Sequence, residues 1–314
     1  MFQLIKLNDV VDFMKLRVPA MIMSGALLIG SMISLGVNGL NWGLDFTGGT
    51  LIEVGYEQPA QLDVIRQQMN NGGFPDAVVQ NFGSSRDVLI RLAPREGVKA
   101  AELGDQVVSL LRADGSQVEQ RRIEFVGPNV GDELTEQGGL AMLVALLCIL
   151  IYVAMRFEWR FALGSVLALA HDVIITLGLF SVIQMEFDLN VLAALLAVIG
   201  YSLNDTIVVC DRIRENFRKM RKGEPVEVVN NSLTQTLSRT IITSLTTILV
   251  LIALFYFGGA IIHGFATALL FGVFIGTYSS IYIASSMALL LGVSREDLMP
   301  PEVEKEGADQ EPLI

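Results

Sequence analysis

Residues 189–210, LNVLAALLAVIGYSLNDTIVVC, form an apolar run that is interrupted by a single asparagine–aspartate pair. The hydrocarbon core of a bilayer, about 30 Å thick, is crossed by about 20 helical residues. A carboxylate inside such a helix is costly unless it is paired, hydrated or protonated, and it usually marks a function. The run therefore predicts a transmembrane helix, and Asp205 predicts a role for a polar group inside the membrane.

Five more apolar runs of similar length lie on either side, at residues 18–37, 139–155, 161–183, 240–257 and 265–291. With 52% hydrophobic and only 18% charged residues, the chain is more apolar than a soluble domain. The first run lacks a small-x-small cleavage site and is longer than a signal peptide core, which indicates an uncleaved anchor. The pattern predicts an α-helical polytopic membrane protein with six spans, one before and five after the polar segment 38–138.

The distribution of lysine and arginine predicts the orientation. These residues collect before the first run, between the second and third runs, and after the fourth run: Lys6, Lys15, Arg17, Arg156, Arg160, Arg212, Arg214, Arg218, Lys219, Arg221 and Lys222. Because basic residues stay on the cytoplasmic side, residues 1–17, 211–239 and the acidic tail 292–314 are expected in the cytoplasm and residues 38–138 outside. Gly223 and Pro225 interrupt the connection 211–239, which predicts a short interfacial helix with a turn, and the tail is expected to lack ordered structure.

The outer segment has the pattern of a small α+β domain. Strand-like and helical stretches alternate at residues 50–56, 60–70, 77–82, 87–92, 98–112 and 118–126. The order β-α-β-β-α-β predicts a ferredoxin-like fold with one modest core, too small for a deep substrate chamber. The net charge of −11 lies mainly in this segment and in the tail, which excludes nucleic-acid binding.

Asp205, beside Asn204, has two interpretations. It is a titrating group whose protonation follows the approach and departure of a cation, or it is a static carboxylate that packs two helices, and the rarity of such residues in spans favours the first. Arg239, at the start of the run 240–257, is the nearest candidate cation. The residues alone favour a different role for Arg239, as an anchor whose guanidinium reaches the membrane surface.

Other polar groups within the runs leave their roles open. His171 and Asp172 lie near the middle of the third run, where a proton relay and a pair satisfied by neighbouring helices are about equally supported. The fifth run begins with hydroxyl side chains that either pack helices or guide water beside Asp205: Thr240, Thr243, Ser244, Thr246 and Thr247. Gly272 and Gly276 form a GxxxG step, which indicates close helix packing, and His263 is expected in an outer loop.

The sequence shows no motif of an enzyme. There is no GxSxG, Walker A or HExxH pattern, and two histidines without metal-ligand spacing predict neither a metal nor another cofactor. The glycine-rich stretch GLDFTGGT, residues 43–50, lacks the Gly-Lys-Ser/Thr of a nucleotide loop. Asp45, Gly48 and Gly49 are therefore expected to form a turn and a contact surface where the first span meets the outer domain.

Four motifs together resemble one family. They are GLDFTGGT at 43–50, RFEWRFA at 156–162, YSLNDTIVVCDRIREN at 201–216, and SRT with TSLTT within 238–247. The chain is similar, over nearly its whole length, to the SecF branch of the SecD/SecF family of bacterial protein export, within the resistance-nodulation-division superfamily.

The resemblance implies a subunit of the bacterial inner membrane with both termini cytoplasmic and residues 38–138 periplasmic. It implies partnership with SecD, the SecYEG channel, preproteins and membrane lipids, with YajC as a further candidate. It also implies that a proton-motive or sodium-motive force completes preprotein translocation, with H⁺ or Na⁺ as the coupling ion and no cofactor. Asp205 and Arg239 then belong to the ion path at the interface with SecD, together with the candidates Asn204, Thr243, Thr247 and Asp172.

Two other functions remain open at this point. A small-molecule or lipid exporter of the same superfamily would share the buried carboxylates but would need larger outer domains. An assembly subunit that conducts no ion would hold SecD in place, with Asp205 in a structural role. The outer domain, which has no long apolar strip, is expected to dock SecD's outer domain and to leave the main preprotein contacts to SecD.

Overall fold

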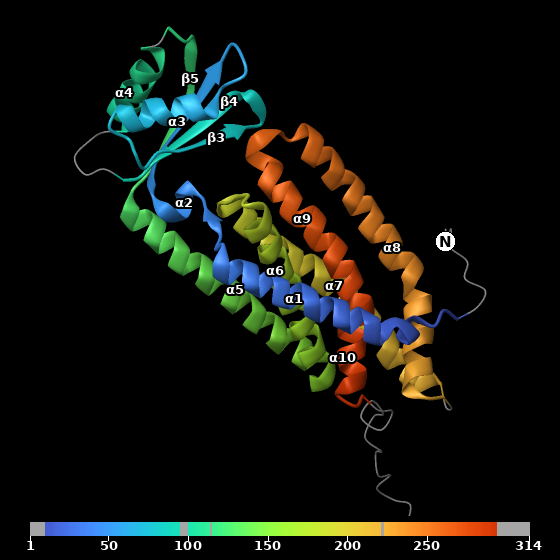
Figure 1. Ribbon diagram of the computed structural model, residues 1–314. Helices are drawn as coiled ribbons and strands as arrows, with labels where there is room; N and C mark the ends of the chain where they lie inside the picture. The colour runs from blue at the N-terminus through green and yellow to red at the C-terminus, as the bar shows by residue number, and fades with distance from the viewer. Residues whose placement is uncertain (1–9, 95–99, 114, 221–222, 294–314) are drawn as a thin grey trace, which may run out of the picture.

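The computed structural model, which describes residues 10–94, 100–113, 115–220 and 223–293, is a bundle of long helices with an α+β unit at one end (Figure 1). Within these residues, six helical segments are long and apolar enough to cross a membrane, as predicted. They are α1 (Arg17–Val37) after the 3₁₀ turn η1 (Phe13–Leu16), α5 (Pro128–Arg156), α6 (Trp159–Ile183), α7 (Leu189–Lys219), α8 (Pro225–Phe257), and α9 (Gly259–Ser279), which continues through the π-turn η2 (Ser280–Ala284) into α10 (Ser285–Leu290).

The connection between the fourth and fifth spans differs from the prediction. Instead of a short interfacial helix within 211–239, α7 continues to Lys219 and α8 begins at Pro225, so the two spans extend as a helical hairpin. The polar stretch keeps a buried apolar stripe, including Ile213, Phe217 and Leu233. A capping box formed by Glu224 and Glu227 starts α8.

Two other boundaries also differ. α5 begins at Pro128, eleven residues before the predicted span 139–155, because proline is favoured in the first helical turn. α9 begins at Gly259, so His263 lies in a helix rather than in a loop, and its ring packs 4.1 Å from the Phe255 ring centroid. Residues 1–9 of the predicted N-terminal segment and 294–314 of the predicted tail lie outside the described residues.

The α+β unit contains β2 (Gly49–Tyr56), α3 (Leu62–Asn71), β3 (Val78–Phe82), β4 (Ser84–Leu92), α4 (Ala100–Arg112) and β5 (Val118–Val126), in the order expected from the sequence. The strands form an antiparallel sheet in the order β3-β4-β2-β5. Helices α3 and α4 pack on one face around a core that includes Ile52, Ile90 and Leu111 (Figure 1). Residues 98 and 99 of the predicted second helix lie outside the described residues.

The other face of the sheet looks toward the helix ends. Leu51 and Leu89 of this face form a small cluster with Leu44 of α2 (Leu44–Thr47). A cavity of about 950 Å³ separates the rest of this face from the α6–α7 and α8–α9 turns. Below it, β1 (Asn41–Trp42) pairs in parallel with β6 (Glu186–Phe187), which ties the chain after α1 to the turn between α6 and α7.

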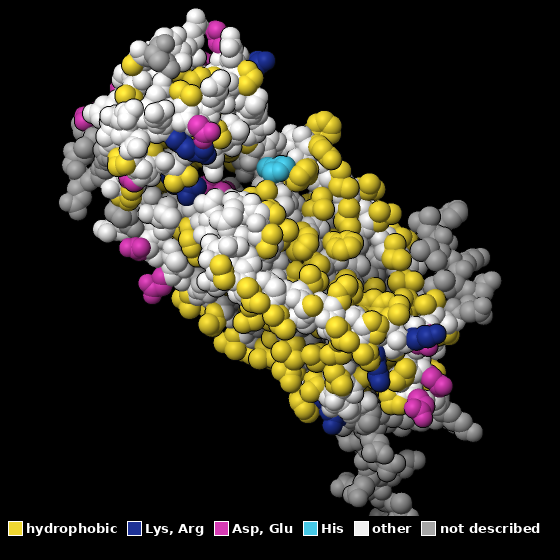
Figure 2. Space-filling view, in the orientation of Figure 1, with side chains coloured by type: hydrophobic (Ala, Val, Ile, Leu, Met, Phe, Trp, Pro, Cys, Tyr) yellow, Lys and Arg dark blue, Asp and Glu magenta, His cyan; other side chains and the backbone are white. Residues whose placement is uncertain are grey.

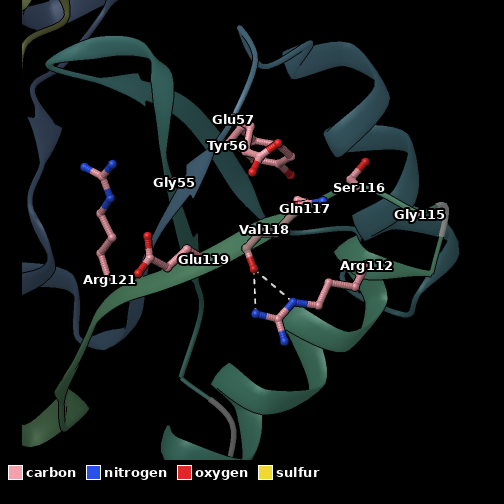
Figure 3. Close-up of a pocket in the computed structure, with 10 residues that line it drawn as sticks. All are labelled: Gly55, Tyr56, Glu57, Arg112, Gly115, Ser116, Gln117, Val118, Glu119 and Arg121. Atoms are coloured by element: carbon pink, nitrogen blue, oxygen red, sulfur yellow. Dashed lines mark hydrogen bonds between the residues drawn. The ribbon is translucent and has the colours of Figure 1, made fainter.

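A second cavity, of about 580 Å³, lies within the α+β unit between the end of α4 and the start of β5 (Figure 3). There the Arg112 guanidinium donates two hydrogen bonds to the carbonyl oxygen of Val118, at 2.9 and 2.6 Å. These bonds fix the helix end to the strand. None of the side chains predicted for the ion path lines this cavity.

The surface of the helices is apolar between two charged ends. In Figure 2, yellow side chains cover the bundle, whereas lysine, arginine, aspartate and glutamate gather at the α+β unit and at the opposite end. Exposed side chains of this girdle include Ile29, Leu143 and Val250. Apolar area of this extent is the surface that hydrocarbon chains cover in a membrane protein.

Candidate functional site

Asp205 lies on the face of α7 that packs against α8, and its side chain is only 4% exposed. Two groups of α8 act on its carboxyl group, the positive charge of Arg239 and the hydroxyl of Ser244. Its Oδ2 atom is buried and has no hydrogen-bond partner in the described part of the chain. An unpaired carboxylate oxygen in this position is costly, so the site is suited to take up a proton or a cation.

The hydroxyl group that acts on this carboxyl group, that of Ser244, is not one of the two that the resemblance singled out, Thr243 and Thr247. Thr240 and Ser244 lie four residues apart on one face of α8, and both are buried. Ser244 also shares a hydrogen bond of 2.7 Å with Thr277 of α9. By contrast, the Thr243 and Thr247 hydroxyls donate to carbonyl oxygens of their own helix, at Arg239 (3.0 Å) and Thr243 (2.9 Å).

Two other residues predicted beside Asp205 are exposed rather than buried. Asn204 is exposed on α7, and Arg239 is exposed on α8 although its charge acts on Asp205. The hydroxyl groups of Thr206 and Thr240 are both buried, and neither has a hydrogen-bond partner among the described residues. Thr243 and Thr247 are also four residues apart, so spacing in the sequence could not have distinguished the two pairs.

Asp172 has a different environment. It is 1% exposed, and its Oδ2 accepts hydrogen bonds from Ser202 of α7 at 2.6 Å and from Ser279 of α9 at 2.7 Å. Its Oδ1 lies 2.9 Å from Nδ1 of His171. Both carboxyl oxygens of Asp172 are thus partnered, which favours a packing role for this carboxyl group, whereas the buried Nε2 of His171 has no partner among the described residues.

The GxxxG step lets α9 approach α7 at this point. A Cβ atom at Gly272 would lie 2.3 Å from Cγ2 of Val198, and one at Gly276 would lie 3.0 Å from Cβ of Ser202. These distances confirm the predicted packing role. The close approach brings Ser279 of α9 within hydrogen-bond distance of Asp172.

The glycine-rich stretch forms the predicted turn and contacts the start of α7. Asp45 Oδ2 accepts a hydrogen bond from the Leu189 backbone N–H at 3.0 Å, and Asp188 Oδ1 accepts one from Val191 at 2.8 Å. The two carboxylates cap the helix. Gly49 has φ +121°, and a Cβ atom there would lie 2.3 Å from the Leu92 carbonyl oxygen, so the turn closes against the sheet. Gly48, with φ +65°, ends α2.

Polar contacts also join the α+β unit to the α6–α7 turn. Arg91 of β4 lies 3.3 Å from Glu186, and Gln80 of β3 donates to the same carboxylate at 3.3 Å. Burial raises the pKa of Glu186, and the charge of Arg91 opposes this shift. Burial likewise raises the pKa of Asp188, against the hydrogen bond from Val191. Among the described residues, no group of three or more His, Cys, Asp or Glu side chains is placed to hold a metal.

Two family models match the segments that contain the capped turn and the buried carboxylates. The family described as "Protein export membrane protein SecD/SecF, C-terminal" matches residues 106–294, and the "SecD/SecF GG Motif" matches residues 33–60. The first range contains Asp205, Arg239 and Asp172, and the second contains Asp45, Gly48 and Gly49. The capped turn and the buried carboxylates therefore lie within the segments that the two family models match.

Curated relatives match almost the whole chain. Protein translocase subunit SecF of Vibrio alginolyticus is 62% identical, covering 98% of this chain and 98% of the relative. The SecF subunits of Escherichia coli O157:H7 and Pseudomonas aeruginosa are 53% and 51% identical, covering 98% and 96% of this chain and 96% and 98% of the relatives.

Among solved structures, the crystal structure of SecDF, a translocon-associated membrane protein from Thermus thermophilus, superposes with a TM-score of 0.81 at 38% identity. It covers 90% of this chain, which spans 39% of the SecDF chain. SecDF in a super-membrane-facing form superposes with a TM-score of 0.66, also at 38% identity, covering 92% of this chain and 39% of that chain. The chain belongs to the SecF family of protein translocase subunits.

Proposed function

We propose that this chain, together with SecD, uses a proton-motive or sodium-motive force to complete preprotein translocation across the bacterial inner membrane. In this arrangement one span precedes and five follow a ferredoxin-like α+β domain, which lies in the periplasm, and both termini lie in the cytoplasm. The basic residues at the α5–α6 turn and at the end of α7 support this orientation. The SecDF relative, named as translocon-associated, supports partnership with SecD and a translocon channel.

The observation that carries the proposal is the contrast between two buried carboxyl groups. Asp172 has hydrogen-bond partners at both oxygens, whereas Oδ2 of Asp205 has none in the described structure. A carboxylate that serves packing needs such partners, but one that takes up and releases an ion needs an open position. Asp205 has that open position and a cation, Arg239, on a neighbouring helix.

A change in the distance between Asp205 and Arg239 couples ion binding to movement. When the guanidinium is near, it favours the ionised carboxylate, and when it moves away, burial favours the neutral form. Each elementary charge that crosses the membrane contributes about 2.3 kcal/mol per 100 mV, which is sufficient to shift an equilibrium between two arrangements of the helices. H⁺ or Na⁺ is then the coupling ion, and the chain acts as a transport subunit rather than as an enzyme.

The test uses proteoliposomes that contain the full chain with SecD. Asp205→Asn keeps the shape of the side chain but cannot titrate, so we expect loss of ion flux under an imposed pH or sodium gradient with the complex still assembled. The matched control is Asp211→Asn, on the same helix, whose side chain is 48% exposed and pairs with Arg214 at 2.7 Å. The control should retain flux, and a normal flux in Asp205→Asn would refute the proposal.

A second variant separates two roles of Arg239. Arg239→Lys keeps the charge but loses the planar fork of the guanidinium, and we expect impaired translocation because that geometry serves Asp205. Full activity of Arg239→Lys would instead support a role as a membrane anchor. Loss of activity without loss of ion flux would favour the assembly role over the ion path.

Contacts with other partners follow from the same proposal. SecD, the SecYEG channel, YajC, preproteins and lipids are the expected partners, and the α+β domain is expected to dock SecD's outer domain. Site-specific crosslinking from the β3–β4 hairpin during stalled export tests this expectation. Adducts mainly with SecD would support docking, whereas equally strong preprotein adducts would show that this domain grips the substrate itself.

A further inference from the structure

A small cavity of about 230 Å³ lies where α5 ends beside α7 and α8. Three arginines from these three helices line it together with a single carboxylate and a few other residues: Arg156, Arg212, Arg239, Asp211, Phe157, Ile207, Val208, Gln235 and Thr236. The lining thus carries three positive charges and one negative charge. An excess of positive charge in a cavity favours an anion over a cation.

The acidic groups near the cavity leave its arginines available for an anion. Asp211 pairs closely with Arg214 at 2.7 Å and only distantly with Arg156 at 3.7 Å. Arg212 shares Glu215 with Lys219, at 2.8 and 2.5 Å. These pairs are partly exposed and contribute little, so an incoming anion can replace them at small cost.

The protein holds Arg156 in position without an anion. The ring of Phe157 lies under two guanidinium groups, those of Arg156 at 5.2 Å and Arg214 at 5.1 Å from its centroid. Arg214 also donates to the carbonyl oxygen of Arg156 at 3.3 Å. This stacking orients the end of α5 toward the cavity.

The residues around the cavity are of the kinds found at a membrane interface. The exposed, apolar Met155 (84% exposed) precedes it on α5, and the exposed Trp159 follows, with the Arg160 guanidinium 5.5 Å from its ring centroid. Tryptophan and arginine occupy the interface between hydrocarbon and water. Ile207 and Val208 give the cavity an apolar wall beside its charges.

We propose that Arg156, Arg212 and Arg239 bind the phosphate group of an anionic phospholipid. Guanidinium groups donate paired hydrogen bonds to phosphate oxygens, and basic pockets between spans on the cytoplasmic side bind acidic headgroups. The apolar wall suits a lipid better than free phosphate, which has no apolar part. Because Arg239 also acts on Asp205, a bound lipid would compete for its charge, and this last consequence alone rests on the proposed function.

Lipid binding can be measured by the fluorescence of one of the two tryptophans of the chain, Trp159. A Trp42→Phe background leaves Trp159, two residues from Phe157, as the only tryptophan. The purified full chain is placed in vesicles of phosphatidylcholine that contain increasing amounts of brominated phosphatidylglycerol or, in a parallel series, of brominated phosphatidylcholine. Quenching of the Trp159 fluorescence in the two series gives the binding constant of phosphatidylglycerol relative to that of phosphatidylcholine. We expect brominated phosphatidylglycerol to be preferred over brominated phosphatidylcholine by about 25-fold, because two arginines contribute about 1 kcal/mol each.

Variants then identify the site. One basic residue near an anionic surface contributes about 1 kcal/mol, so Arg156→Gln and Arg212→Gln should each lower the preference about fivefold, and together abolish it. Arg156→Lys and Arg212→Lys keep the charge but lose the paired hydrogen bonds and should retain part of the preference, and unchanged thermal unfolding of the glutamine variants would exclude misfolding as the cause. Arg17→Gln, an equal charge loss at the exposed start of α1, should leave it unchanged.

Three outcomes would overturn the proposal. An unchanged preference in the double glutamine variant would show that the lipid binds elsewhere. An equal loss in Arg17→Gln would reduce the effect to general surface charge. Displacement of the lipid by millimolar inorganic phosphate, without change in ionic strength, would show that the cavity takes the free anion instead.

Discussion

Replacement of Asp45 by alanine should loosen the start of α7. The substitution removes the acceptor of the Leu189 N–H, an N-cap interaction worth about 1 kcal/mol. It also removes a negative charge near the helix N-terminus, worth about 0.3–1 kcal/mol. Because Asp45 repels the neighbouring Asp188, part of this second contribution is offset. We expect a net loss of about 1–1.5 kcal/mol, confined to the first turn of α7 because Asp188 still caps it.

Hydrogen exchange followed by mass spectrometry on the full chain measures this loss directly. A local loss of 1–1.5 kcal/mol corresponds to about five- to tenfold faster exchange in peptides that cover residues 187–195. Asp45→Asn is the matched control, because asparagine is also a good N-cap residue, and its exchange should stay close to that of the wild type. Equal exchange in the alanine variant and the wild type would refute the capping role. Faster exchange throughout the chain would show that Asp45 stabilises the whole fold instead.

Three further predictions concern Glu186 in the α6–α7 turn, Gly272 between α7 and α9, and Ser279 beside Asp172. Burial raises the pKa of Glu186 above 4.5, so the folded protein holds this proton more tightly than the unfolded chain does. The contact of Glu186 with the α+β unit is therefore most stable below about pH 4.5 and loses stability as the pH rises above it. Glu186→Gln should flatten this pH dependence, measured by hydrogen exchange of residues 184–188. Gly272→Ala places a methyl group against Val198 and should cost about 1–3 kcal/mol in thermal unfolding, with partial recovery in the double variant with Val198→Ala. Ser279→Ala removes one of the hydroxyl donors to Asp172 and should lower thermal stability by about 1 kcal/mol, without loss of ion flux.

The spans and the α+β unit could be predicted because each rests on a local pattern. Apolar runs identified all six helices, and alternation identified the strands near their observed bounds, with β5 at Val118–Val126 as predicted. The helical hairpin beyond residue 210 could not be predicted in this way, because hydropathy reports contact with lipid and not helicity. Its helices share a buried apolar cluster that includes Phe217 and Leu233, and an average of hydropathy over a window conceals these positions.

The candidate site was predictable in part. The cost of a carboxylate in a membrane identified Asp205 and Asp172 but could not distinguish them, since their partners come from helices distant in sequence, such as Ser279 for Asp172. The rotation of α8 decides which hydroxyls face Asp205, and this brings Ser244 inward rather than Thr243. The pairing of β1 with β6 likewise joins segments too far apart for any local signal.

The length of α7 has a mechanical consequence. The helix runs without a break from Leu189, where Asp45 holds it, to Lys219 in the hairpin. At 1.5 Å per residue, Asp205 lies about 24 Å along this rod from the capped end. A continuous helix moves largely as a rigid body. A displacement of the glycine-rich turn would therefore shift Asp205 and the far hairpin together. Gly200 is the only glycine in α7. Bending of the helix at this residue would reduce the displacement that reaches Asp205.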